Sequence, residues 1–195
     1  MDMTPMTSTS STAPLGYTIV DTAIGAIAVA WTATGICRVA LPQRDREAME
    51  RRFAAKLDGA GPAEPPAAIA AAIALIKRYA EGEEIDFSSV PVDLDGVDQF
   101  QHAIYEAARK LDFGETTTYG GLADAAGHPG KARETGEALG RNPVPLIVPC
   151  HRILAAGGKI GGFSAPGGSA TKEKLLTLEG VRIGPPPVAQ KAFTF

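Results

Sequence analysis

Cysteine and histidine are scarce in this chain of 195 residues. It contains two cysteines, Cys37 and Cys150, and three histidines, His102, His128 and His151. No Cys-x-x-Cys pair is present, so the closely spaced ligand pairs of structural zinc sites are missing. We therefore expect no metal and no cofactor. We also expect both cysteines to be free thiols, as in a reducing compartment.

The chain also lacks a strong excess of charge and a long apolar run. Lys and Arg total 19 and Asp and Glu total 22, giving a net charge of −3. This charge excludes a strongly basic coat for nucleic acid but allows a local DNA contact. The longest apolar runs, at 23–31 and 67–76, are shorter than the ~18–20 residues of a membrane span. The Ser/Thr-rich start lacks the features of a signal peptide, so we predict a cytoplasmic protein with no membrane partner.

The N-terminal half has the pattern of a small α/β unit. Runs rich in β-branched residues at 17–20, 24–31 and 36–41 predict an antiparallel sheet of three strands. Helices are predicted over 44–57 and 64–81, with Pro65 and Pro66 in the first turn of the second helix. No motif for chemistry is apparent in this half.

The C-terminal half is mainly helical. Helices are predicted over 98–111, from 116–118 to 126, over 131–139 and over 170–178, the last capped by Ser169. The second and third form a helix-turn-helix pattern, which by itself is a weak indication of DNA binding. The predicted fold is α+β, with this division: a flexible segment at 1–14, an N-terminal α/β domain at 15–90, a C-terminal domain at 91–183 and a tail at 184–195.

The segment Asn142-Pro-Val-Pro-Leu-Ile-Val-Pro-Cys-His-Arg152 is the most unusual part of the chain. Residues 146–148 are predicted to form a buried strand, and Pro149 suits the first position of a short helix. Cys150 would then lie in the first helical turn, where free N–H groups and the helix dipole favour a thiolate. We interpret Cys150 as a reactive thiol beside His151 rather than as a buried structural cysteine.

Glu179 ends the last predicted helix, where the helix dipole disfavours an anion. It is either a solvated surface acid or the partner of an imidazole such as His151. A glycine-rich stretch at 157–168 precedes this helix and would permit a close backbone approach to a ligand. It matches no phosphate-binding motif, and it could equally be a plain connection.

Three segments resemble the O6-alkylguanine-DNA alkyltransferases, also called methylated-DNA–protein-cysteine methyltransferases. They are Gly114-Glu-Thr-Thr-Thr-Tyr119, the run at 142–152, and Thr171 to Gly180. The resemblance covers about residues 98–180. It implies an N-terminal ribonuclease-H-like domain, followed by a mainly helical, winged-helix-like domain with a helix-turn-helix. It also implies a DNA repair protein that acts once, transferring a methyl or larger alkyl group from guanine O6 to its own Cys150.

The resemblance implies a catalytic group of four residues. Cys150 would attack the alkyl carbon, and His151 would deprotonate the thiol through a water. Glu179 would orient and stabilise His151, as the third group of a nucleophile triad does. Asn142 would tie the recognition helix to the active-site segment.

The partner implied is double-stranded DNA containing O6-alkylguanine, bound in the minor groove by a monomer that flips the nucleotide out. Tyr119 would help to rotate the phosphate and would bind the base. Arg133 would fill the gap in the base stack, and Gly136 would let its helix approach the DNA closely. The remaining family positions at the pocket are Phe163, Ser164 and Lys172.

Several features depart from the family pattern. Phe163 stands where the family commonly has tyrosine, and the recognition helix carries Glu134 and Glu137, which phosphates disfavour. Residues 98–180 contain nine basic and nine acidic residues and so have no net charge. Any positive surface for DNA must therefore be local.

Two other functions fit parts of the sequence. A damage-sensing module could bind alkylated DNA without repairing it, but such proteins lack the nucleophilic cysteine, so Cys150 favours repair. A cysteine hydrolase would need an oxyanion hole and an extended cleft in addition to a Cys/His pair, and we rank it last.

Overall fold

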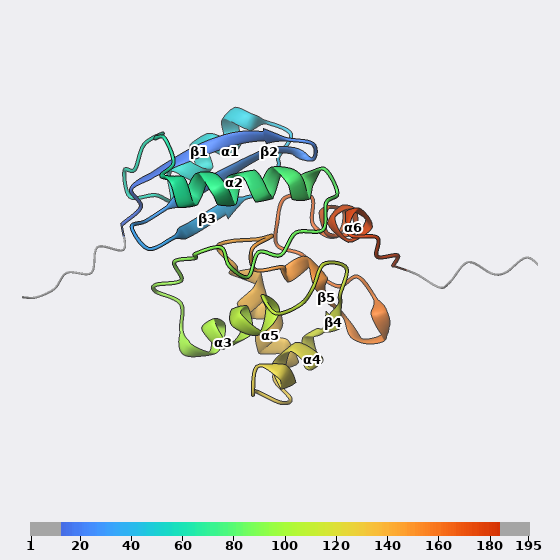
Figure 1. The fold of residues 1–195 in the computed structure, drawn as a ribbon. Helices are drawn as coiled ribbons and strands as arrows, with labels where there is room; N and C mark the ends of the chain where they lie inside the picture. The colour runs from blue at the N-terminus through green and yellow to red at the C-terminus, as the bar shows by residue number, and fades with distance from the viewer. Residues whose placement is uncertain (1–12, 184–195) are drawn as a thin grey trace, which may run out of the picture.

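The computed structural model describes residues 13–183, which fold as mixed helix and sheet, so the predicted α+β class is confirmed (Figure 1). The predicted tail at 184–195 lies outside the described residues, as does the predicted N-terminal segment except for residues 13 and 14. None of the helices within 13–183 has the length and apolar character needed to cross a membrane.

The sheet of the N-terminal half has the predicted antiparallel order. β1 (Gly16–Thr22) pairs with β2 (Gly25–Trp31), and β2 pairs with β3 (Ile36–Ala40). Alternate residues of β2 face opposite sides of the sheet. Ala28 and Ala30 pack with α1 (Arg46–Ala54), whereas the larger side chains at 27, 29 and 31 pack toward α2 (Ala67–Ala80). The sheet therefore lies between two helices.

The starts of two predicted helices, α2 and α6, are shifted by one or a few residues. α2 begins at Ala67, and Pro65 and Pro66 precede it rather than forming its first turn. Pro66 has extended geometry and is the residue before the helix, and its carbonyl accepts the first N–H groups. α6 (Ser169–Leu178) begins at Ser169 itself, after Gly168 at φ 56°. The prediction that Ser169 caps this helix is therefore wrong.

The C-terminal half contains the predicted short helices. α3 (Gln99–Ala108) begins with a reciprocal capping box between Asp98 and Gln101. α4 (Tyr119–Ala125) is capped by the side chain of Thr118, and a tight turn leads to α5 (Ala132–Gly140). β4 (Thr117–Thr118) pairs in parallel with β5 (Ile153–Leu154), which follows the one-turn 3₁₀ helix η1 (Cys150–Arg152). A second 3₁₀ turn, η2 (Ala156–Gly158), begins the glycine-rich stretch.

The predicted strand at 146–148 is absent, and a buried turn takes its place. Leu146 has φ 75°, the amide of Val148 donates to the carbonyl of Val144 at 2.9 Å, and Pro145 bridges to Val148. The three residues 146–148 are buried, as predicted. Because the prolines at 143, 145 and 149 have no N–H to donate, the segment cannot extend a ladder and closes on itself instead.

The two halves share one hydrophobic core. A single cluster of buried residues includes β2, β3 and α2 from the first half and α3, α5 and η1 from the second. The segment Pro91–Gly96 is hydrogen-bonded to the first residue of β3. Ile36 donates to the carbonyl of Pro91 and accepts from the amide of Asp93, each at 2.9 Å. The segment 91–96 is thus attached to the start of β3.

Candidate active site

Glu179 is the centre of a buried polar cluster. At the end of α6, its carboxylate accepts a hydrogen bond of 2.7 Å from Nε2 of His151. The guanidinium of Arg152 donates to both carboxylate oxygens, at 2.8 and 2.9 Å, and the amide of Gly114 donates at 3.0 Å. Glu179 is therefore the partner of His151 and not a solvated surface acid.

The donors around Glu179 keep it ionised. Burial alone would raise the pKa of this carboxyl group, but hydrogen bonds and charge from His151 and Arg152 lower it to about 2. Arg152 balances the charge in the same cluster, and its Nη1 also donates to the carbonyl of Leu111 at 2.7 Å. The sequence gives no signal of this pairing between Arg152 and Glu179.

Tyr79 completes the cluster from the other half of the chain. Its hydroxyl, on α2, donates to Oε1 of Glu179 at 2.8 Å and lies 3.3 Å from Nε2 of His151. Burial and the Glu179 charge raise the pKa of this phenol, so it stays protonated and donates. The sequence pattern places Tyr79 on the apolar face of a helix and gives no signal of a polar role. No motif for chemistry is apparent in this half of the sequence, yet the structure places Tyr79 in contact with both His151 and Glu179.

The hydrogen bond to Glu179 also sets the tautomer of His151. Since Nε2 faces a carboxylate, it carries the proton, and Nδ1 is left as the proton acceptor. Nδ1 is buried and has no hydrogen-bond partner among the described residues. Burial lowers the pKa of His151 against the opposing effect of Glu179, and the charges of Arg152 and Lys172 lower it further. His151 is therefore a neutral base at neutral pH.

Cys150 follows the buried turn and is held by Asn142. The amide nitrogen Nδ2 of Asn142 donates to Sγ at 3.2 Å and to the carbonyl of Val148 at 2.9 Å. The amide oxygen accepts from the amide of Val144 at 3.0 Å. Asn142 thus connects the end of α5 to the cysteine, as the family resemblance implies.

The predicted activation of Cys150 by a helix terminus is wrong. Cys150 is 7% exposed and begins a 3₁₀ turn of three residues, too short to carry a sizeable dipole. Burial raises the pKa of its thiol, and the opposing effects of Asn142 and Lys172 do not reverse the shift. The resting sulfur is a thiol, so its use as a nucleophile requires a base.

Lys172 is buried beside the same sulfur. Its Nζ donates to the carbonyls of Ile153 and Gly162 and lies 5.6 Å from the ring centroid of Tyr119. Burial lowers its pKa to about 8, and the thiolate form of Cys150 would act in the opposite direction. At neutral pH this ammonium favours the thiolate form of Cys150.

The expected DNA side of the site is a cavity of about 340 Å³ that reaches Cys150. Tyr119 and Gly136, both on the helix-turn-helix, line it together with Phe163 and Ser164. The Tyr119 hydroxyl donates to the carbonyl of Gly162 at 3.2 Å. A Cβ atom at Gly136 would lie 3.7 Å from the Tyr119 ring, so glycine leaves this wall of the cavity open.

Arg133 lies outside this cavity, on the exposed face of α5. Its side chain is 90% exposed and is 3.3 Å from Glu137, and Lys131 is 2.9 Å from Glu134. The structure thus brings nine of the ten predicted site residues around Cys150 and the Glu179 cluster and leaves Arg133 on the surface. Within residues 13–183, no three His, Cys, Asp or Glu side chains gather as a metal site would require.

Comparison with known proteins gives the family. The profile of the 6-O-methylguanine DNA methyltransferase DNA-binding domain matches residues 99–181. Methylated-DNA–protein-cysteine methyltransferases from Mycobacterium bovis and Metallosphaera sedula are 43% and 38% identical, over 114 and 113 residues. The matches cover 58% of this chain in both cases and 67% and 69% of the relatives.

A solved structure extends the similarity to the N-terminal half. The crystal structure of Mycobacterium tuberculosis OGT in complex with DNA superposes with a TM-score of 0.65 at 35% identity. The superposition covers 84% of this chain and 92% of the other. The chain belongs to the methylated-DNA–protein-cysteine methyltransferase family. This confirms the resemblance found from the three sequence segments.

Proposed function

We propose that the protein repairs O6-alkylguanine in double-stranded DNA by transferring the alkyl group to Cys150, each molecule acting once. The observation that carries the proposal is the placement of a buried thiol, held by Asn142, beside a neutral His151 whose tautomer is fixed by Glu179. Family membership supplies the substrate class. The site geometry supports Cys150 as the nucleophile, His151 as the base and Glu179 as the group that orients the base.

The transfer step begins with the thiol proton, which passes to Nδ1 of His151 through a water. The Sγ lone pair then attacks the alkyl carbon, so that an S–C bond forms while the C–O6 bond breaks and its electron pair stays on the purine. Overall, the proton that leaves the thiol replaces the alkyl group on guanine. A thioether is inert at neutral pH, which explains why the protein would act once.

Charge develops on the departing guanine and needs donors in place. Tyr119 and Ser164 line the cavity that the base would enter, and we propose the Tyr119 hydroxyl and the Ser164 amide as these donors. Lys172 shares the Gly162 carbonyl with Tyr119, at 3.3 and 3.2 Å, and so fixes that wall of the pocket. Phe163 contributes apolar area to the same wall.

The target carbon is inside the duplex, so we infer that the nucleotide is flipped out at a cost of a few kcal/mol. The exposed Arg133 is available to enter the base stack if it leaves Glu137. Gly136 has no side chain, so the backbone of the flipped DNA strand could pass close to α5 at this position. We propose minor-groove binding by a monomer.

The finer architecture belongs to the same proposal. The sheet with α1 and α2 on opposite faces supports a ribonuclease-H-like unit at 15–90. The α4–α5 pair and the short β4–β5 pairing support a winged-helix-like unit at 91–183 that binds DNA.

The test is to incubate the protein with a duplex containing one O6-methylguanine and to weigh the intact protein. We expect a gain of one methyl group, found on the Cys150 peptide and absent from Cys150→Ser. Cys37→Ser is the matched control, because it removes the other thiol and should still gain the methyl group. Binding of the lesion without a gain in mass would overturn repair in favour of damage sensing.

A further inference from the structure

A second cavity, of about 440 Å³, lies between the two halves and also reaches Cys150. Four basic residues line it, and no Asp or Glu does. They are Arg38, Arg52, Lys56 and Arg141. None of the four forms an ion pair within the described part of the chain. Arg52 donates a hydrogen bond of 3.4 Å to the side-chain oxygen of Gln43, which carries no charge.

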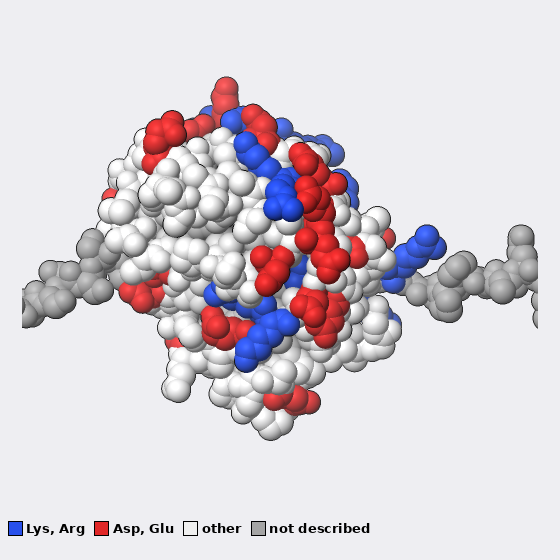
Figure 2. Space-filling model, in the orientation of Figure 1, with Lys and Arg blue, Asp and Glu red and all other residues white. Residues whose placement is uncertain are grey.

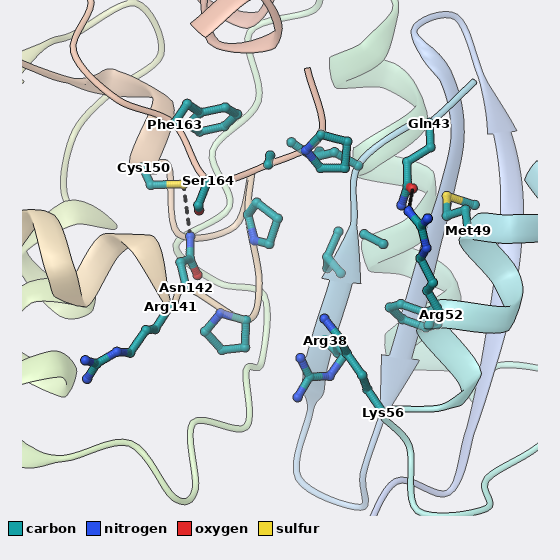
Figure 3. A pocket seen from close by; sticks show the side chains of 18 of the residues that line it. Arg38, Gln43, Met49, Arg52, Lys56, Arg141, Asn142, Cys150, Phe163 and Ser164 are labelled. Carbon is teal, nitrogen blue, oxygen red and sulfur yellow. Dashed lines mark hydrogen bonds between the residues drawn. The ribbon is translucent and has the colours of Figure 1, made fainter. Parts of the chain in front are cut away.

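Figure 3 shows how this cavity is built. Arg38, Arg52 and Lys56 lie on the side formed by β3 and the region of α1, and Cys150 and Ser164 lie on the opposite side. The cationic side therefore belongs to the N-terminal half of the chain. The reacting sulfur belongs to the C-terminal half.

Hydrogen bonds fix the cationic side relative to the sulfur. The amide of Val39, next to Arg38 in β3, donates to the carbonyl of Pro143 at 2.8 Å. The neighbouring Asn142 donates to Sγ of Cys150 at 3.2 Å. Arg38 is therefore placed by a paired strand that is bonded directly to the loop before the nucleophile.

The recognition helix, in contrast, offers little free positive charge. Lys131 and Arg133 are both paired with acids of the same helix. On the face shown in Figure 2, basic and acidic side chains are interspersed rather than separated into a basic surface. Affinity for DNA depends largely on cations that neutralise phosphates. Because the cations of the recognition helix are paired with acids, contacts to the DNA phosphates need basic residues from elsewhere in the protein.

We infer that the cationic side of this cavity binds the phosphodiester backbone next to the flipped nucleotide. The inference rests on the proposed function, because a nucleotide delivered to Cys150 brings its flanking phosphates to the cavities that adjoin the sulfur. Guanidinium groups pair with phosphate oxygens through two parallel hydrogen bonds, and two of the three cations on this side, Arg38 and Arg52, are arginines. The N-terminal half thus takes part in DNA binding.

The test uses binding, so that it does not depend on alkyl transfer. In a Cys150→Ser background, fluorescence anisotropy would measure the affinity of Arg52→Ala/Lys56→Ala and of Arg38→Ala for unmodified and O6-methylguanine duplexes over a range of salt. Each phosphate contact contributes about 0.9 to the slope of log K against log salt. We expect the slope to fall by about 2 for the double variant and about 1 for Arg38→Ala, with both duplexes affected alike.

The matched control is Arg46→Ala/Arg51→Ala. It removes two exposed cations from the same helix, with side chains 48% and 68% exposed, that do not line the cavity. We expect the slope of this control to stay at the parent value. An unchanged slope for Arg52→Ala/Lys56→Ala, or an equal loss in the control, would overturn the inference. So would a loss confined to the lesion duplex. Failure of the unmutated protein to gain a methyl group would instead overturn the proposed function.

Discussion

The hydroxyl of Tyr79 donates a hydrogen bond of 2.8 Å to Oε1 of Glu179, a residue 100 positions further along the chain. The same oxygen accepts from Nε2 of His151 at 2.7 Å. His151, the proposed base, and a tyrosine on α2 of the N-terminal half therefore share one carboxylate oxygen. The properties of His151 depend on both halves of the molecule.

Replacing Tyr79 with phenylalanine should raise the pKa of His151. The phenol donates a hydrogen bond to the Glu179 oxygen that also faces His151. Without this bond, the negative charge of Glu179 should stabilise the charged form of His151 more strongly. The acid limb of the pH profile of the methyl-transfer rate should then move to higher pH, and the rate should fall most at low pH. The second-order rate constant with a methylated duplex, measured from pH 5 to 9, checks this.

The matched control for that prediction is Tyr17→Phe. Tyr17 is a buried tyrosine of β1 whose hydroxyl also donates to a glutamate, Glu50, at 3.2 Å. Its loss should lower stability without moving the pH profile. A Tyr79→Phe profile that superposes on those of the unmutated protein and the control would contradict the coupling.

Methyl transfer should follow a bell-shaped pH profile. His151 must be neutral to accept a proton, and burial lowers its pKa below the ordinary 6.5, so the rate should fall only as the pH drops below about 6.5. Lys172 has a pKa of about 8 and favours the thiolate when charged, so the rate should fall again as the pH rises past that value. A rate that keeps rising to pH 10 would be inconsistent with this assignment.

Lys172→Met should slow the transfer at pH 7 and remove the alkaline limb. The charge that favours the Cys150 thiolate is lost, while the buried apolar part of the side chain is largely retained. Lys174→Met, at an exposed position of the same helix, serves as the control. The alkaline limb in the two variants is the deciding readout, because a purely structural defect would lower the whole profile instead.

Glu179→Gln should destabilise the protein by about 3–5 kcal/mol at pH 7, since Arg152 is left buried without a counter-charge. The pKa of Glu179 is about 2 in the folded protein, against an ordinary 4.5. The stabilisation that ionised Glu179 gives to the folded protein is therefore complete above pH 4.5 and is lost as the pH falls toward 2.

Urea unfolding of the two proteins at pH 7 and pH 3 measures this difference. Glu173→Gln, an exposed change in the same helix, should have no comparable effect. A difference between Glu179→Gln and the unmutated protein that stays constant from pH 7 to pH 3 would argue against the ion pair as its source.

The sequence determined the elements with strong local signals. The strands of the sheet and the helix-turn-helix pair follow from residue patterns within a few positions, and the run around Cys150 identified the family. The pairing of Glu179 with His151 was also open to prediction, because an acid at a helix C-terminus is locally unfavourable and must be stabilised by something else.

The tertiary structure alone decided the state of the nucleophile and the partners of the base. Helix-terminus chemistry predicted a low pKa for Cys150, but burial, which no local pattern measures, raises it. Tyr79 and the cations around Arg38 have ordinary positions in the sequence. They matter because the two halves share one core, which places Tyr79 against Glu179 and places Arg38 on a cavity that reaches Cys150. Charge and desolvation act through space, so these effects depend on distances that the order of residues does not contain.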